Sequence, residues 1–357
     1  MNKNPFPVFA KRLQLARKMR GFSLQKLSDL LENKVTKQAL SKYEQGKMFP
    51  SAEVLISLAK VLELDIDYFS RPFTVDLPDV DFRKRAKLEK KEIDRIKEIT
   101  RDQLERYLEI ENFLKLDKPF SNPIENLQIQ KAEDAEIAAD RLRTEWNLGY
   151  DPLPNVVEML EENGIKVIEL DAPDSFDGMA AKVGNTFLIV LNKNQADLVR
   201  KRFTTVHELG HLLMNLGSIG NLKLKESCCN AFAGAFLLPS NSLKAEIGEK
   251  RTRLSIGELI PIKNYYGLSI AAIIFRAKQS RIIPDHFFKD FWKWRNQNDE
   301  RRREIGLGNY LGREGSSRFE QLVLRAVNEE LITSSKGANL LGISMRKLRE
   351  KLILKWA

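Results

Sequence analysis

Two histidines and a glutamate carry the clearest chemistry in this sequence of 357 residues. His207 and His211 are two of the three histidines, and Glu208 follows the first of them in the stretch RFTTVHELGHLLMN (202–215). Residues four positions apart on an α-helix lie one above the other, so both imidazoles can face one cation. Imidazole nitrogens are standard ligands of Zn²⁺, and Glu208 would stand beside the metal, where it can take a proton from water.

A third ligand distinguishes a metal site from a buried helix with a polar stripe. Glu226 comes fifteen residues after His211 and opens ESCCNAFAGAFLLP (226–239), whose apolar spacing predicts a second helix ending near Pro239. If the two helices pack together, two histidines and one carboxylate form a zinc site with a position open to water. The expected apolar face of the second helix is Cys229, Phe232, Ala233, Phe236 and Leu237.

The preceding segments predict the framework that positions these residues. Helical patterns over 132–148 and 153–164 are followed by three apolar runs, at 166–170, 177–183 and 186–192, with a turn at Gly184-Asn185. We therefore expect an α+β region with a small sheet, followed by the helix that contains both histidines.

The two quoted motifs resemble the ImmA/IrrE family of metallopeptidases, whose pattern is R-F-x-x-x-H-E-x-G-H followed by E-x-x-x-N-x-F-A. The resemblance extends over about residues 126–282 and implies a zincin-like fold with Zn²⁺ as cofactor. It implies that His207, His211 and Glu226 are zinc ligands and that Glu208 is the catalytic base. The Cys228-Cys229 pair departs from the family pattern without affecting the ligands, so it bears on substrate or regulation.

The first seventy residues predict five short helices, and the third is the informative one. Ser23 and Thr36 are expected to cap the second and third helices, and the fourth helix is expected to begin at Ser51, after Pro50. The segment VTKQALSKYEQG (35–46) resembles the signature of the XRE (lambda-repressor-like) helix-turn-helix domains. Its outward side chains are of types that reach bases and phosphates, and they are Lys37, Gln38, Ser41 and Lys42. The resemblance implies binding to operator DNA as a homodimer.

The charge distribution agrees with a polyanionic partner for the ends of the chain. Residues 1–72 carry 13 Lys and Arg against 7 Asp and Glu, residues 73–250 carry 25 against 31, and residues 251–357 carry 21 against 11. Basic ends suit DNA, although a solvated basic face gives the same count. The alternating charges of 81–118 predict one or two long, exposed helices that serve as a spacer, with pairing between chains as the alternative.

The basic C-terminal region leaves several interpretations open. The aromatic and basic residues near 283–303 favour an amphipathic helix over a single-stranded nucleic-acid site. The stretch SSKGANLLGISMRKLREKL (334–352) has the pattern of a helix-turn-helix, so a second DNA contact and a dimerisation or sensor module both remain possible roles.

The domain organisation follows from these segments. We expect a helix-turn-helix domain over 1–72, a charged helical linker over 73–125, a metallopeptidase domain over 126–282 and a basic helical region over 283–357. The predicted fold class is multidomain and mainly α, with an α+β middle domain.

Other residues exclude or qualify further roles. No apolar run is long enough to span a bilayer and no signal peptide is evident, which predicts a cytoplasmic protein without a membrane partner.

Cys228 and Cys229 are expected to be reduced and packed, with redox sensing as the alternative. The oxyanion-stabilising residue is not identified, and a packing role is favoured for each of its candidates, which are Tyr265, Tyr266, Arg276 and His286.

Together these features predict a DNA-binding transcriptional regulator, a repressor, with a zinc peptidase that hydrolyses a peptide bond in a repressor-type protein, in cis or in trans. One alternative is a regulator whose zinc domain is a structural or ligand-sensing module without proteolytic activity. Another is an enzyme that uses DNA only for recruitment.

Overall fold

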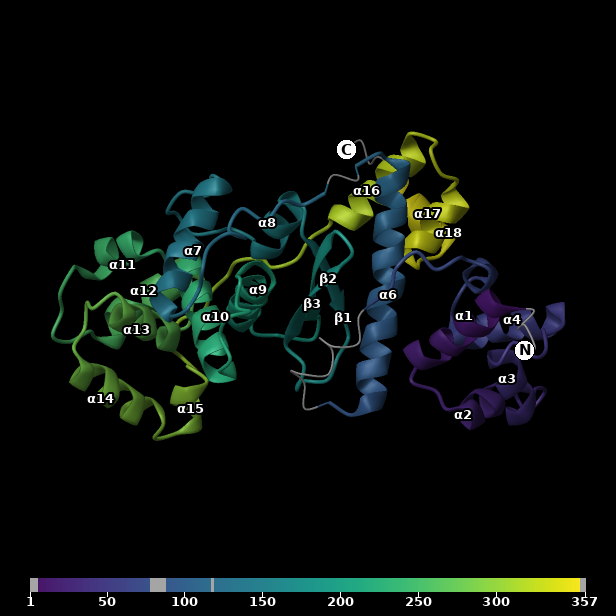
Figure 1. The fold of residues 1–357 in the computed structure, drawn as a ribbon, viewed down its shortest axis with the longest axis horizontal. Coiled ribbons are helices and arrows are strands. Elements are labelled where there is room, and N and C mark those ends of the chain that lie inside the picture. Colours follow the sequence, from purple (N-terminus) through teal and green to yellow (C-terminus); the bar gives the residue numbers. More distant parts are fainter. Residues whose placement is uncertain (1–5, 78–87, 117–118, 354–357) are drawn as a thin grey trace. The chain divides into compact units, whose positions relative to one another are not determined.

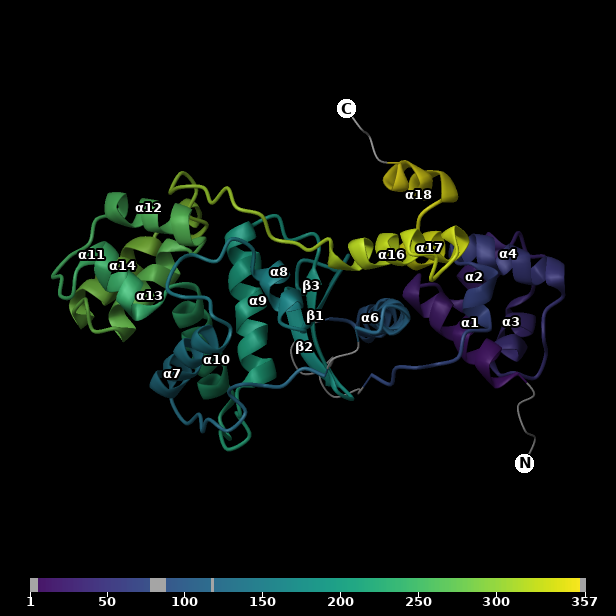
Figure 2. The same cartoon turned by 90° about the horizontal axis from the view of Figure 1, so that it is seen from above.

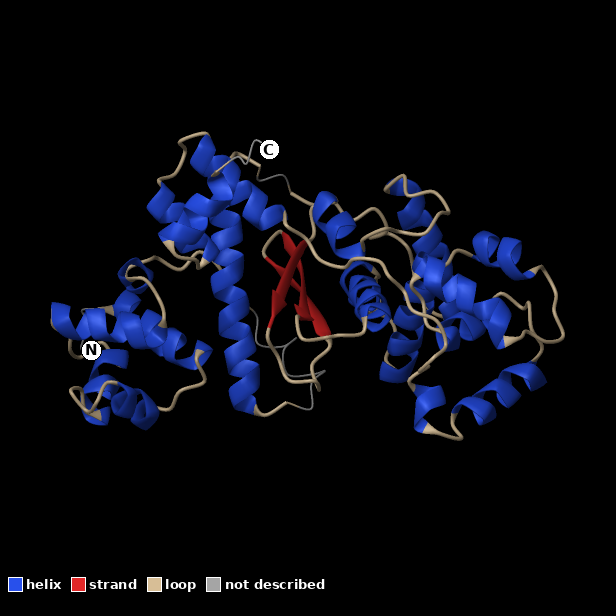
Figure 3. Cartoon of the chain, turned by 180° about the vertical axis from the view of Figure 1, so that it is seen from behind, coloured by secondary structure: helices blue, strands red, loops and turns tan. Residues whose placement is uncertain are grey.

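The computed structural model describes residues 6–77, 88–116 and 119–353, and the chain forms two compact units. The terminal unit joins Met1–Asp117 to Arg318–Ala357, and the middle unit is Lys118–Ser317. The middle unit is therefore an insertion between two segments that fold together. Helices dominate both units, and a small sheet lies in the middle unit (Figures 1 and 3). The predicted fold class is confirmed.

The first part of the terminal unit is a small helical domain. Its elements are α1 (Pro7–Met19), α2 (Leu24–Leu30), α3 (Lys37–Glu44), α4 (Ala52–Leu62) and the 3-10 helix η1 (Ile66–Phe69). The expected caps are confirmed, because the hydroxyls of Ser23 and Thr36 each accept a hydrogen bond from the backbone N–H three residues on. Ser51 caps α4 in the same way. One buried core, which includes Leu13, Leu27, Leu40 and Leu58, holds the helices together.

The long charged helix α6 (Lys90–Phe113) is packed, so the expectation of a spacer exposed to solvent is wrong. Its first contact is with α1, where Arg12 Nη1 and Glu105 Oε2 form an ion pair of 2.8 Å between side chains that are both 1% exposed. Beyond that pair, Tyr107, Ile110 and Leu114 enter a second apolar cluster. The alternating charges of this segment predicted a helix exposed to solvent. Some of these charged side chains are instead buried, and they are paired because a buried charge needs a partner.

The partner of this second cluster comes from the end of the chain. It is formed by α16 (Arg318–Asn328), α17 (Ser334–Leu341) and α18 (Met345–Leu352). Arg106 Nη1 of α6 donates hydrogen bonds to the carbonyl oxygens of Asn339 at 2.9 Å and Leu340 at 3.2 Å. The predicted boundaries of the linker and the C-terminal region remain predictions. By packing, 318–353 belong to the terminal unit and Lys118–Ser317 to the middle unit.

The middle unit contains the predicted α+β region and additional helices. Its first elements are α7 (Ala132–Glu145), α8 (Val156–Glu162), β1 (Lys166–Leu170), β2 (Gly178–Val183) and β3 (Thr186–Asn192). They are followed by α9 (Leu198–Leu213), α10 (Leu222–Leu237), α11 (Ser240–Ile247), α12 (Ile256–Tyr266), α13 (Ile270–Gln279), α14 (Asp285–Arg295) and α15 (Asp299–Arg302). One apolar core extends from α7 to α14.

The sheet has the strand order β1-β3-β2 and supports α9. β3 pairs in parallel with β1 and antiparallel with β2, and Gly184-Asn185 makes the predicted turn between β2 and β3. The last six residues of β3 are buried, as expected for a central strand. α9 lies against β2 and β3 on one side and against α10 on another. The helix with the histidines therefore has a rigid base.

No helix among the described residues combines the length and the apolar character needed to cross a bilayer.

Candidate metal centre

Helix α9 places the two motif histidines one turn apart. It begins after Asp197, whose Oδ1 accepts hydrogen bonds from Val199 N at 2.9 Å and Arg200 N at 3.1 Å. Its inner face includes Val206 and Leu209, both fully buried. His207 and His211 are left on a partly exposed side, with side chains 16% and 6% exposed.

Helix α10 brings Glu226 to the same place. The five residues predicted for its apolar face are all buried, as expected. A Cβ atom on Gly210 of α9 would lie only 3.1 Å from Cδ1 of Phe232 on α10. The glycine therefore permits the two helices to approach closely, which accounts for a helix-weakening residue inside the motif.

The three predicted ligands converge. Nε2 of His207 lies 3.1 Å from Nε2 of His211 and 3.1 Å from Oε2 of Glu226, and Nε2 of His211 lies 3.3 Å from Oε1 of Glu226. Tetrahedral zinc with bonds of about 2.0–2.1 Å separates its ligand atoms by roughly 3.3–3.4 Å. The donor set and its spacing thus fit one zinc ion, and among the described residues these three form the group of His, Cys, Asp and Glu side chains with metal-binding geometry.

Asn230 completes the surroundings of His207. Its Oδ1 lies 2.9 Å from Nδ1 of His207, one helical turn after Glu226 on α10. A carbonyl oxygen can only accept, so this contact favours the tautomer with the proton on Nδ1, which leaves the lone pair of Nε2 for a cation held by the three ligand atoms. Asn230 was part of the quoted motif, but no role was inferred for it from the sequence. The structure identifies it as the residue that orients the first histidine.

Glu208 is 5% exposed on the same helix, directly after the first histidine. A carboxylate in such a low-exposure position beside a metal site is suited to proton transfer, because little bulk water competes for the proton. Its catalytic role remains a prediction.

Of the four candidate oxyanion donors, Arg276 and Tyr266 are packed, as expected, whereas Tyr265 and His286 are exposed. Arg276 is 1% exposed, and its Nη1 pairs with Glu136 Oε2 at 3.0 Å. The same side chain fills the space beside Gly234, where a Cβ would lie 2.7 Å from its Cδ. Tyr265 is 60% exposed, and Tyr266 is buried in the core. His286 is exposed on α14.

The adjacent cysteines are buried and free of disulfides. Burial raises the pKa of the Cys228 thiol, and nearby Asp134 and Glu133 act in the same direction. The thiol form is therefore stabilised, which agrees with a packed rather than a reactive residue.

The predicted DNA contacts lie on the outer face of α3. Lys37, Gln38 and Lys42 are exposed and Ser41 is partly exposed. Leu40 is fully buried on the opposite face. The helix thus presents the expected side chains to solvent, and their contact with DNA remains a prediction.

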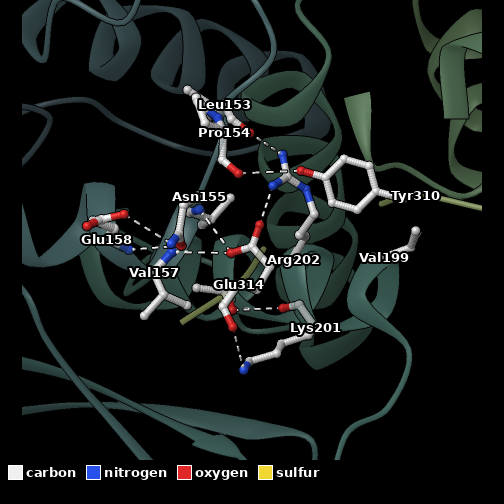
Figure 4. A network of polar contacts seen from close by, with 12 residues as sticks. Leu153, Pro154, Asn155, Val157, Glu158, Val199, Lys201, Arg202, Tyr310 and Glu314 are labelled. Carbon is white, nitrogen blue, oxygen red and sulfur yellow. Dashed lines mark hydrogen bonds and ion pairs between the residues drawn. The ribbon is translucent and has the colours of Figure 1, made fainter. Parts of the chain in front are cut away.

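A second charged cluster on α9 was missed by the sequence analysis. Arg202 is fully buried and forms an ion pair with Glu314 (Figure 4). Its Nη2 donates hydrogen bonds to the carbonyl oxygens of Leu153 at 2.8 Å and Tyr266 at 3.2 Å. The ring of Tyr310 lies over the guanidinium, with 4.8 Å between the guanidinium carbon and the ring centroid. The first residue of the quoted motif therefore ties α9 to three other segments.

Glu314 is held from several sides. Its Oε2 accepts hydrogen bonds from Val156 N at 2.9 Å and Val157 N at 3.4 Å, at the start of α8. Lys201 Nζ donates to its backbone oxygen at 3.1 Å. Burial raises the pKa of Glu314, while Arg202 and the backbone N–H groups act in the opposite direction. The sequence around Glu314 predicts only a loop, because glycines stand at 306, 308, 312 and 315, so no sequence signal could have identified it.

Two family models match this chain. Residues 160–278, which include α9 and α10, match the IrrE N-terminal-like domain of the peptidase M78 family. Residues 13–69, which include α2 and α3, match a helix-turn-helix model. Both resemblances inferred from the sequence are confirmed. The chain joins an XRE-type helix-turn-helix domain to an IrrE/ImmA-like domain with a metallopeptidase-type fold.

A curated relative matches part of this chain. Over 61 residues the chain is 34% identical to the SPbeta prophage-derived uncharacterized HTH-type transcriptional regulator YonR of Bacillus subtilis (strain 168). The alignment covers 17% of this chain and 55% of that protein, so the chain spans about half the length of the relative.

Proposed function

We propose that this protein is a DNA-binding transcriptional repressor with a zinc-dependent peptidase that hydrolyses a peptide bond in a repressor-type protein, in cis or in trans. The observation that supports the peptidase is the convergence of His207, His211 and Glu226, with ligand atoms 3.1–3.3 Å apart. The polar outer face of α3 supports the DNA-binding role.

The proposed reaction assigns each side chain a separate task. His207, His211 and Glu226 would hold Zn²⁺, which supplies Lewis acidity for the scissile carbonyl and for water. Glu208 accepts the proton of the attacking water and passes it to the leaving amine, so that the proton balance of hydrolysis closes. Asn230 keeps Nδ1 of His207 protonated and its ring fixed.

The DNA-binding role assigns α3 to the major groove. Lys37, Gln38, Ser41 and Lys42 would contact bases and phosphates. XRE-type domains use paired half-sites, so we propose a homodimer on operator DNA. A regulator acts where the DNA is, so we propose that the protein works in the cytoplasm of a prokaryotic cell.

The test uses the purified full-length chain and an inactive copy of it as substrate. Zinc content is measured by mass spectrometry, and wild-type protein is mixed with an epitope-tagged Glu208→Gln chain, with and without duplex DNA. We expect one zinc per chain in both proteins. Cleavage products should appear with wild-type protein and fall by about 10²–10⁴-fold when both chains carry Glu208→Gln.

Two outcomes contradict the proposal. In the first, the Glu208→Gln variant relieves repression as readily as the wild-type protein does, which would assign the zinc domain a sensing or structural role. Absence of zinc from the wild-type chain would remove the metal centre itself. Loss of cleavage on deleting residues 1–72 would show that the DNA-binding domain contributes to the reaction.

A further inference from the structure

The last three described helices form a compact helix-turn-helix arrangement. α17 and α18 each have eight residues and are joined by the three residues 342–344. Gly342 adopts φ +64°, a left-handed conformation that ends α17 and starts the turn. Thr333 and Ser344 accept hydrogen bonds from the N–H groups of Lys336 and Lys347 at 3.2 Å and 3.3 Å, so both helices have side-chain caps. Two short helices across a three-residue turn with glycine are typical of DNA-binding helix-turn-helix motifs.

Close packing fixes this arrangement. Gly337 of α17 faces α16 and α18, and a Cβ there would lie 2.5 Å from Cγ2 of Val327 and 3.6 Å from Cδ2 of Leu348. Leu348 is fully buried and anchors α18 on its two neighbours. Since Arg106 of α6 holds the last carbonyls of α17, the motif has a rigid support within the terminal unit.

The outer face of α18 is strongly basic. The sequence MRKLREKL contains four basic residues and one acidic residue, and all five are exposed. Arg346 pairs with Glu350, and Lys351 pairs with Glu320 of α16. Lys347 and Arg349 form no ion pair with a described residue. Figure 2, which looks along α6, shows α18 on the far side of α16 and α17 from α6. The basic face is thus not used to hold the helix to that support.

We propose that α17 and α18 form a second site for duplex DNA, with the start of α18 in the major groove. In helix-turn-helix motifs the N-terminal residues of the second helix contact base edges, and here those residues are Arg346 and Lys347. Arg349 lies further along the exposed face, where it contacts a phosphate. This site goes beyond the proposed function of α3, because it would give one compact unit two DNA-reading helices.

Duplex DNA fits this face better than other polyanions do. An exposed helix of this length enters the major groove of B-form DNA, whereas the deep, narrow major groove of duplex RNA excludes side chains. Binding of single strands relies on stacking against aromatic rings, and α18 contains none.

The test measures anisotropy of a fluorescein-labelled duplex of about 25 base pairs with the full-length chain at several salt concentrations. The starting variant is Gln38→Ala/Lys42→Ala, which weakens the contribution of α3. Adding Lys347→Ala/Arg349→Ala is expected to lower the duplex affinity about tenfold and to reduce the salt slope by about 0.9, since the pair includes one phosphate contact, that of Arg349.

The matched control removes two exposed lysines of α14 through Lys289→Ala/Lys293→Ala. An affinity equal to that of this control overturns the proposal. So does a larger loss on single-stranded RNA or on vesicles with anionic lipids than on the duplex. The charge reversal Lys347→Glu/Arg349→Glu should abolish the residual binding, and unchanged thermal unfolding by circular dichroism verifies that the fold is retained. Because all of these variants carry the same weakened α3, a negative result for α18 does not contradict the proposed DNA binding by α3.

Discussion

Helix α9 carries two polar clusters that differ in exposure. Arg202 and Glu314 are fully buried, and fixed donors and acceptors surround both. His207 and His211, further along α9, and Glu226 of α10 have side chains 16%, 6% and 41% exposed. In the sealed cluster, Arg202 and Glu314 neutralise each other within the protein. In the open cluster, the side chains of His207, His211 and Glu226 bring together lone pairs that can bind a cation. The two clusters therefore differ in solvent exposure and in whether their charges and lone pairs already have partners. The number of charged groups does not distinguish a structural cluster from a metal-binding one.

The largest expected effect comes from breaking the sealed cluster. Arg202→Met leaves Glu314 buried without its guanidinium, and loss of one partner of a buried pair costs about 3–5 kcal/mol of unfolding free energy. For a unit of this size that corresponds to a fall in Tm of roughly 6–20 °C, measured by calorimetry. The double variant Arg202→Met/Glu314→Gln should recover part of the loss, because the unpaired charge is gone.

The control for that prediction stands two residues away. Arg200 pairs with Asp177 at 2.7 Å, but the two side chains are 55% and 36% exposed. Arg200→Ala should change the unfolding free energy by about 1 kcal/mol or less, as is usual for exposed pairs. Equal losses for Arg200→Ala and Arg202→Met would remove the distinction between sealed and exposed charge.

The open cluster should respond in metal binding instead of stability. Asn230→Ala removes the acceptor that orients His207, and loss of such a partner lowers metal affinity by about 10–100-fold. Zinc affinity measured by competition with a chelator checks this, and the Tm of the metal-free protein should change little. Asn230→Asp retains an oxygen acceptor and should keep most of the affinity. A weakened metal site in the Asp variant as well would contradict the orienting role.

The smallest effect concerns an exposed carboxylate held by fixed donors. The backbone N–H of Ser255 and the guanidinium of Arg251 lower the pKa of Glu258 from 4.5 to about 2. The folded pKa lies below the unfolded one, so its stabilisation is complete above pH 4.5 and is lost as the pH falls toward about 2. NMR titration should give a midpoint near 2, and Arg251→Ala should raise it. An unchanged midpoint would mean that Arg251 does not lower the pKa of Glu258.

Local patterns accounted for the parts of the molecule that local rules determine. The hydroxyl caps of α2 and α3 and the turn at Gly184-Asn185 depend on residues a few positions apart, so the sequence predicted them. The spacing of His207 and His211 is likewise local. Glu226 needed one further assumption, that two consecutive helices pack together, and their close approach at Gly210 supports it.

Long-range pairings were not accessible from the sequence. Glu314 meets Arg202 across 112 residues, and its surroundings predicted only a loop. The burial of α6 was missed for the same reason, because its cover arrives more than 200 residues later in α16 and α17. Asn230 was visible in the motif, but its role depends on a contact with the neighbouring helix.

The insertion of the middle unit into the terminal unit has a consequence for synthesis on the ribosome. α6 leaves the exit tunnel early, and the helices that cover Tyr107 and Ile110 emerge only after the whole middle unit has been made. A nascent chain therefore carries an uncovered apolar stripe until α16 and α17 have been made. Truncated products would retain that stripe, which gives chaperones and proteases a way to tell unfinished regulators from finished ones.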